Sequence, residues 1–468
     1  IFDILYKNSK QKTKQDSFIS KFELFLTIFF KQKMGKIPCP LPFQSKQKSI
    51  NSDQFHPIYS DLSSSSSLSL SRSSSSLYSQ PSLPSVPSLT PLSTHSELLS
   101  NTFCASTFTG LSSSVFCLSL AGKHLYTGTS NGEILLRNKD PLNQEKNHSI
   151  VVAQKQSKSS VKSIVIFGDK LFTAHQDHKI RVWKIDNHDD DIEASNQNYY
   201  RCIATLPTLN DRCMRLFSAK NYVEVRRHKK CTWVHHVDTV SALAISSDNS
   251  LLYSASWDRT FKIWRISDFK CLESVWNAHD DAINAIALSK NGYVYTGSAD
   301  MKIKIWKKEQ GEKSIHTLIA TLEKHKSSVN ALALSTDDSV LYSGACDRSI
   351  IVWEKDSGGD KMVVSGALRG HTKAILCLCV VDDLVVSGSA DKTVRIWKKG
   401  IGKSYSCLAV LEGHNGPVKC LTASLDNSNS NSNSNSNSNS NDFGCGNSYV
   451  VYSGSLDCDI KVWKIWVP

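Results

Sequence analysis

The nine residues from Ser389 to Trp397 read SADKTVRIW, and this stretch decides the fold. Its second half alternates polar and apolar side chains like a half-buried β-strand, and its first half has turn-forming residues. The same spacing, with an Asp six residues before a Trp, recurs in HQDHKIRVW, SWDRTFKIW, SADMKIKIW, ACDRSIIVW and SLDCDIKVW, which end at Trp183, Trp264, Trp306, Trp353 and Trp463. A seventh copy, TSNGEILLR, has Asn131 for the Asp and Arg137 for the Trp. Seven copies of one unit indicate a repeat protein.

A second pattern precedes each copy, an alternating apolar run such as VFCLSL from Val115 or VKCLTA from Val418. Its third position always holds a small residue: Cys117, Ser163, Ala242, Ala285, Ala331, Cys377 and Cys420. We expect these residues on the innermost strand of each unit, where the sheets converge and leave little room. This placement also gives three of the cysteines a packing role.

These units resemble WD-repeat β-propeller repeats, each of which forms four antiparallel strands. The resemblance implies a buried hydrogen-bonded tetrad of His, Ser or Thr, Asp and Trp in each complete repeat. Five sets are complete: His236, Ser254, Asp258, Trp264; His279, Thr296, Asp300, Trp306; His325, Ser343, Asp347, Trp353; His371, Ser387, Asp391, Trp397; and His414, Ser453, Asp457, Trp463. A Ser, His and Asp together are also a hydrolase pattern, but fivefold repetition favours a structural role, in which the carboxylate satisfies the donors of a tight turn.

The two ends of the repeat region predict how the ring closes. The last repeat stops five residues after Trp463, which leaves no room for a fourth strand. The segment FCASTFTGLSSSV from Phe103 aligns with SCLAVLEGHNGPV from Ser406, so residues 103–109 are expected to complete the last blade and remove the open edges. The first two repeats have Leu111 and Ser157 at the His position, and we expect their blades to be looser.

The predicted fold is therefore all-β, a seven-bladed WD-repeat β-propeller over residues 103–468 with a disordered N-terminal tail. Residues 34–100 are expected to be that tail, since 19 of the 41 residues from Ser60 to Ser100 are serine and such a composition buries little apolar surface. The first methionine is Met34, so residues 1–33 are candidates for a leader that the native protein lacks.

Composition bounds the function. The longest apolar run, Phe22 to Phe30, is about half the ~20 residues that cross a bilayer, so no membrane partner is expected. The net charge is +12, but residues 1–48 hold ten lysines against three acidic residues, and residues 211–235 hold seven basic residues against two acidic ones. The rest of the chain is neutral. The 14 cysteines form no C-x-x-C pair, so neither a metal site nor a cofactor is predicted, and we expect reduced thiols in the cytoplasm or nucleus.

Two insertions distinguish this chain from a plain repeat array. Residues 207–235 are rich in aromatic and basic side chains, and we expect an ordered lobe on the top face of the propeller, where the fourth strand of one blade leads to the next blade. Residues 427–441 alternate Asn and Ser and are expected to be a loop on the bottom face. The lobe carries the predicted partner-binding cluster: Arg226, Arg227, Lys229 and Lys230, with Trp257 as their expected neighbour. The alternative is that these charges only pair with nearby acids and that Trp257 packs the lobe.

The insertion, the degenerate first repeat and the serine-rich leader together resemble plant WD-repeat proteins of the Jingubang type, which implies a non-catalytic regulator. We therefore predict a monomeric regulatory scaffold, not an enzyme, that presents propeller faces to protein partners in plant signalling or transcription-linked regulation. One alternative is an RNA-binding propeller that uses the basic lobe. A second is a substrate receptor of a ubiquitin ligase, although none of the six Trp residues is followed by the Asp of that motif.

Overall fold

The computed structural model describes residues 86–90, 102–139, 150–153, 159–185, 200–216, 222–226, 229–309, 315–356, 358, 361–400, 402, 404–426 and 447–467. These residues all lie in one compact unit. The predicted 1–33 leader, the tail up to Ser85 and the Asn/Ser loop of residues 427–441 lie outside the described residues. Within the described ranges, no helix is long and apolar enough to cross a membrane.

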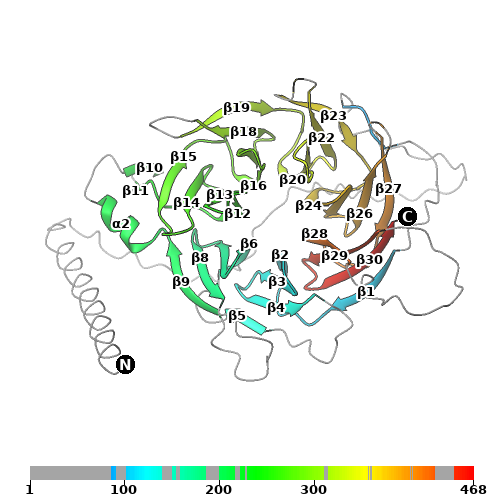
Figure 1. Cartoon of the computed structure of the whole chain (residues 1–468), viewed down its shortest axis with the longest axis horizontal. Helices are drawn as coiled ribbons and strands as arrows, with labels where there is room; N and C mark the ends of the chain where they lie inside the picture. The colour runs from blue at the N-terminus through cyan, green and yellow to red at the C-terminus, as the bar shows by residue number, and fades with distance from the viewer. Residues whose placement is uncertain are drawn as a thin grey trace, which may run out of the picture. The chain divides into compact units, whose positions relative to one another are not determined.

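Seven four-stranded antiparallel sheets, which we number as blades 1 to 7, are arranged around a ring (Figure 1). Blades 1 to 3 are β2 (Val115–Ala121), β3 (His124–Thr129), β4 (Ile134–Asn138), β5 (Ile150–Ala153); β6 (Val161–Phe167), β7 (Lys170–His175), β8 (Ile180–Ile185), β9 (Tyr200–Leu206); and β12 (Val240–Ile245), β13 (Leu251–Ser256), β14 (Phe261–Arg265), β15 (Cys271–Val275).

Blades 4 to 6 follow the same order along the chain. They are β16 (Ile283–Leu288), β17 (Tyr293–Ser298), β18 (Ile303–Lys308), β19 (His316–Leu322); β20 (Val329–Leu334), β21 (Val340–Ala345), β22 (Ile350–Lys355), β23 (Met362–Leu368); and β24 (Ile375–Val381), β25 (Leu384–Ser389), β26 (Val394–Lys399), β27 (Tyr405–Leu411). The predicted seven-bladed propeller is confirmed.

Blade 7 closes the ring with strands from both ends of the repeat region. It contains β28 (Val418–Leu425), β29 (Asn447–Ser455), β30 (Ile460–Val467) and β1 (Thr102–Phe108). β1 pairs antiparallel with β30, from Thr102 opposite Ile465 to Phe108 opposite Ile460. The predicted closure by residues 103–109 is confirmed, and blade 7 consequently has no unpaired edge on β30.

The blades stack through a small residue in the second strand of each sheet. Val115 at the start of β2 lies against Gly454 of blade 7, where an added Cβ would come within 2.5 Å of the valine Cγ1. Val161 meets Gly128 in the same way, and Val418 meets Gly388. A side chain at these glycines would push neighbouring blades apart, because close-packed interiors leave no spare volume.

A short segment of the serine-rich tail is ordered, which differs from the expectation that residues 34–100 are all disordered. Residues 86–90, which we call the strap, lie along the outer strand of blade 5. Leu89 N–H donates to Ala367 O and Ala367 N–H donates to Pro87 O, each at 2.9 Å, and Tyr405 N–H of blade 6 donates to Leu89 O at 3.0 Å. Val86 is 2% exposed. The composition did not predict this contact, because the contact depends on one Val and one Leu in a serine-rich segment.

The insertion between blades 2 and 3 forms α2 (Leu209–Leu216) and a hairpin of β10 (Tyr222–Arg226) with β11 (Lys229–Thr232). The insertion thus contains regular elements, although residues 217–221 and 227–228 lie outside the described residues, and α2 does not rest on the top face. The carboxylate of Asp211 accepts a 2.7 Å bond from Cys271 N, and Arg215 donates to Cys271 O. Cys271 begins the outer strand of blade 3, at the end of the blade opposite the turn that holds Trp257. Figure 1 shows α2 at the outer rim.

Candidate functional site: the tetrads and the channel mouth

All five predicted tetrads form, and they share one geometry. In each, His Nδ1 lies 2.8 to 3.0 Å from an Asp oxygen, and His Nε2 lies 2.8 Å from the Ser or Thr hydroxyl. The Trp indole N–H donates to the same hydroxyl at 2.8 to 2.9 Å. The network runs from the turn between the second and third strands to the third strand, and it binds the turn to the sheet.

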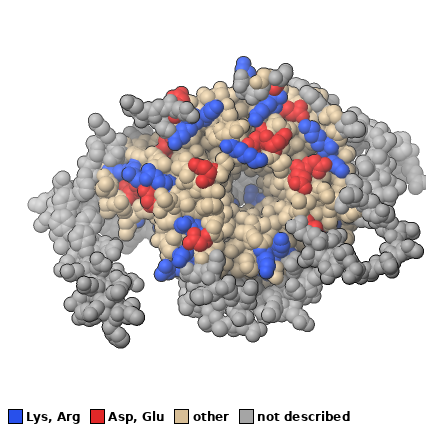
Figure 2. Space-filling view, viewed as in Figure 1, with Lys and Arg blue, Asp and Glu red and all other residues tan. Residues whose placement is uncertain are grey.

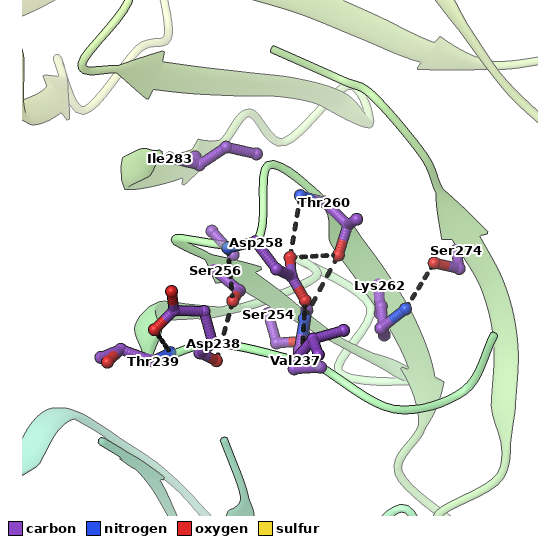
Figure 3. A network of polar contacts seen from close by, with 12 residues as sticks. Val237, Asp238, Thr239, Ser254, Ser256, Asp258, Thr260, Lys262, Ser274 and Ile283 are labelled. Atoms are coloured by element: carbon purple, nitrogen blue, oxygen red, sulfur yellow. Dashed lines mark hydrogen bonds and ion pairs between the residues drawn. The ribbon is translucent and has the colours of Figure 1, made fainter. Parts of the chain in front are cut away.

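The aspartates also satisfy the backbone donors of their turns. Asp258 accepts from Val237 N at 2.9 Å and from Thr260 N at 3.0 Å (Figure 3). Arg259, the turn residue between Asp258 and Thr260, has a φ of 67°, a left-handed conformation that is unfavourable for a residue with a Cβ. The carboxylate thus holds the chain in a turn that it would otherwise avoid.

The charge state of the tetrads follows from their burial. Burial lowers the pKa of His236, and the neighbouring Asp258 only partly offsets this, so the imidazole is neutral at pH 7. Burial alone would raise the pKa of Asp300, but the hydrogen bond from His279 and the backbone donors lower it to about 2. A neutral imidazole that donates from Nδ1 to an ionised carboxylate can accept from a hydroxyl at Nε2.

This arrangement does not suit catalysis. The Ser254 hydroxyl is fully buried, and it is already engaged with both His236 and the Trp264 indole. A nucleophile must reach a substrate, and these hydroxyls face the interior between strands. Within the described ranges, no group of three or more His, Cys, Asp or Glu side chains could hold a metal ion. The Ser, His and Asp sets are therefore structural.

Blade 2 contains a substitute network of three residues that the sequence pattern missed. His175, two residues after Thr173 on β7, lies 2.8 Å from the Thr173 hydroxyl, which accepts from the Trp183 indole at 3.0 Å. Asp177 instead pairs with Arg181 at 2.6 Å. A histidine within the second strand, in a repeat that lacks one before the first strand, was the available signal.

Blade 1 keeps only the turn part of the network, in which Asn131 Oδ1 accepts from Glu133 N at 3.2 Å and from the Thr129 hydroxyl at 2.6 Å. The Thr127 hydroxyl is fully buried and finds no hydrogen-bond partner among the residues that the structure describes. Arg137, which replaces the Trp, lies over the Phe108 ring at 4.9 Å. The expectation of a looser blade thus has a physical basis in blade 1, whereas blade 2 has recovered most of the network.

The turns that hold Asn131 or the aspartates lie on one face of the ring, which we call the Asp-turn face. The inner strands of neighbouring blades touch around the centre, and their second residues lie at this end. In three blades these residues bond to the next blade: Ser241 to Ile283 O, Asn284 to Val329 O and Asn330 to Ile375 O.

Blades 6, 7, 1 and 2 break this pattern with Leu376, Lys419, Phe116 and Lys162. Lys162 Nζ lies 4.1 Å from the centre of the Phe116 ring and 5.8 Å from that of the Trp257 ring. We call Phe116, Lys162, Lys419 and Trp257 the channel mouth. Figure 2 shows blue side-chain atoms within the hollow at the centre of the ring.

The structure divides the predicted partner-binding cluster. Arg226, Lys229 and Lys230 lie on the β10–β11 hairpin, but the placement of their side chains, and all of Arg227, lie outside the described residues. Trp257 is half-buried, and its described ring contact is with Lys162, not with the lobe. Trp233 packs the lobe, since the Arg215 guanidinium lies 3.9 Å over its ring. The union of the cluster with Trp257 stays a prediction.

Comparisons with known proteins agree with this geometry. Residues 228–265, 269–307, 316–354, 362–398 and 405–464 match the family described as WD domain, G-beta repeat. Small ribosomal subunit protein RACK1 of Drosophila melanogaster is 32% identical over 21% of this chain and 30% of its own. A ribosome biogenesis protein WDR12 homolog of Trichoplax adhaerens is 26% identical over 31% of this chain and 35% of its own. The chain thus spans about a third of these relatives.

Among solved structures, the WD40 β-propeller domain of Doa1 superimposes with a TM-score of 0.54 and 19% identity, over 77% of this chain and 96% of that one. This likeness concerns the fold alone. With the five matched repeats and the tetrads that they contain, it leads to one conclusion: the chain is a seven-bladed β-propeller of the WD-repeat type, five of whose repeats match WD domain, G-beta repeat.

Proposed function

We propose that this propeller is a non-catalytic scaffold that binds a protein partner on its Asp-turn face. The observation that carries the proposal is the set of large apolar side chains that tight turns hold on this face. Met301 is 45% exposed and Leu456 is 38% exposed, and each adjoins a tetrad aspartate. Trp257 occupies the same position as Leu456 in another blade. Trp and Met are enriched at protein interfaces, and a rigid turn presents them at little cost in entropy.

The regulatory role in plant signalling or transcription is the finer part of this proposal. It is supported by the resemblance of the insertion and the serine-rich leader to plant proteins of the Jingubang type. Partner identity, cytoplasmic or nuclear location and a monomeric propeller belong to the same proposal. The WD-repeat fold is compatible with each of them because propellers present several faces from one rigid ring.

The face can be tested with a matched pair of variants in one blade. Leu456 and Leu425 are both leucines of blade 7 with similar exposure, 38% and 44%, but they lie at opposite ends of its strands. Trp257→Ala combined with Leu456→Ala should weaken partner capture by the full chain about tenfold or more, as expected for hot-spot residues. Leu425→Ala should leave capture unchanged. Equal losses from both variants would refute the choice of face.

RNA binding is the second candidate, and Lys162 beside Trp257 favours it, as do the names of the two ribosome-related relatives. Contacts to several phosphates make affinity fall steeply with salt. RNA binding should therefore collapse between about 50 and 200 mM salt. A partner held by Met301 and Leu456 should persist over that range and survive nuclease treatment.

A further inference from the structure

The channel mouth contains two cations for which the described residues supply no counter-charge. Lys162 on β6 and Lys419 on β28 lie on the inner strands on either side of β2, which carries Phe116. Neither lysine has an ion pair within the described part of the chain. The described acids that precede the inner strands of blades 3 and 4 on this face are Asp238, Asp280 and Asp281. Asp238 accepts from Thr239 N at 2.7 Å, Asp280 approaches Lys302, and no ion pair among the described residues joins any of the three to Lys162 or Lys419.

The repeats show that these lysines are departures from a structural rule. Where the second residue of an inner strand is Ser or Asn, it ties its blade to the next by a bond to a carbonyl. In blade 1, with Phe116 at that position, the following Cys117 reaches Val161 O instead, at 3.8 Å. In blade 6, with Leu376 there, Cys377 reaches Val418 O at 3.6 Å. In the described part of the chain, no hydrogen bond from the Lys162 or Lys419 side chain joins neighbouring blades.

The surroundings of Lys162 disfavour its charge. Burial and, to a smaller extent, the nearby charge of Lys419 together lower the pKa of Lys162 to about 8, while Cys117 acts only weakly in the other direction. Burial in turn raises the pKa of the Cys117 thiol to about 12, so that it stays neutral. An anion between the two ammonium groups would relieve this repulsion.

We propose that the channel mouth binds a phosphate monoester on a protein segment, with Lys162 and Lys419 as its cationic ligands and Trp257 beside the segment. A phosphate monoester carries about −1.5 to −2 charges at pH 7, which matches two ammonium groups better than a single carboxylate does. Lysines bind phosphate as point charges. The Lys162 ammonium group lies within cation–π distance of both the Phe116 and the Trp257 rings.

This inference rests on the proposed function, since it names the chemistry of a partner on the Asp-turn face. The test uses the full chain and three probes: inorganic phosphate, a blocked Gly-phosphoSer-Gly peptide and its unphosphorylated form. Calorimetric titration should show that the phosphopeptide binds at least tenfold more tightly than inorganic phosphate and that the unphosphorylated peptide does not bind. Equal affinity for inorganic phosphate would overturn the assignment to a protein segment.

The variants decide which residues act. Lys162→Met and Lys419→Met keep the length of the side chain, and each should weaken phosphopeptide binding about tenfold, since each removes one charge-assisted contact. The control is Lys373→Met, because Lys373 is an exposed lysine just before an inner strand of blade 6. Undiminished binding in the double Lys162→Met, Lys419→Met variant would overturn the proposal.

The proposed protein interface and the proposed phosphate site can be refuted independently of each other. If partner capture depends on Leu456 but survives phosphatase treatment and the double lysine variant, the scaffold stands and the phosphate site is wrong. If the phosphopeptide binds through both lysines but capture is indifferent to Trp257 and Leu456, the phosphate site stands and the proposed protein interface is wrong. Preference for a single-stranded RNA, a phosphodiester, over the phosphopeptide would refute the monoester assignment.

Discussion

Replacing Asp391 with Ala tests the structural reading of the tetrads. The carboxylate accepts from His371 Nδ1 and Thr372 N at 2.9 Å, from Thr393 N at 3.0 Å and from the Thr393 hydroxyl at 2.7 Å. His371 is buried, so its donor would be left unsatisfied at a cost of about 1 to 3 kcal/mol. Thr372 is exposed, and water can replace that bond. We therefore expect a total loss of about 2 to 4 kcal/mol.

For a propeller of this size, that loss lowers the melting temperature by about 3 to 5 °C. Differential scanning calorimetry measures it, and Asp383→Ala is the control because Asp383 is an exposed aspartate of the same blade. Hydrogen bonds from His371 and Thr393 hold the pKa of Asp391 well below its usual range despite its burial. Its stabilisation is thus present above about pH 4 and is lost as pH falls, so the variant should differ less from wild type at pH 3. An equal loss in both variants at pH 7 would refute the reasoning.

Three further predictions concern residues that the repeat pattern does not explain. Thr127→Val should raise stability by about 1 kcal/mol in denaturant titration, because it removes an unpartnered buried hydroxyl without changing the shape of the side chain; a loss would show that the hydroxyl has a partner. Leu89→Ala should expose residues 86–90 to limited proteolysis while changing the melting temperature by less than about 2 °C, because the strap adds only local contacts; unchanged cleavage would contradict its docking. Lys162→Met should stabilise the fold by about 1 kcal/mol at pH 7, after allowance for solvent screening. Since the folded-state pKa of Lys162 is lowered, this gain should be full below pH 8 and vanish as pH rises towards about 10.5; a gain independent of pH would contradict the charge argument.

The fold was predictable because its signals are local and repeated. Each tetrad is encoded by four residues at fixed spacing, and an Asp six residues before a Trp places both in one turn and strand. The closure of blade 7 was also predictable, since β1 has the sequence pattern of a fourth strand and the last repeat lacks one.

What the sequence concealed depends on contacts between distant segments. The lobe runs down the outer rim of blade 3 because Asp211 bonds to Cys271, 60 residues later, and no periodicity reports such a pairing. Trp257 lies near Lys162 of the preceding blade because the inner strands converge at the centre of the ring. The sequence shows that Lys162 and Lys419 replace the Ser or Asn of other repeats in the inner strands. This difference could be interpreted only from the structure, which shows that those Ser and Asn side chains bond to carbonyl groups of the next blade.

The most direct test of the central claim is a hydrogen-exchange footprint of a captured protein partner on the full chain. We predict that binding slows amide hydrogen exchange at the turns of the Asp-turn face, residues 257–260, 299–302 and 456–459. Exchange at the opposite turns of blades 3 and 4, residues 246–250 and 289–293, should be unchanged. Protection of those opposite turns, with the Asp-turn face unaffected, would contradict the account.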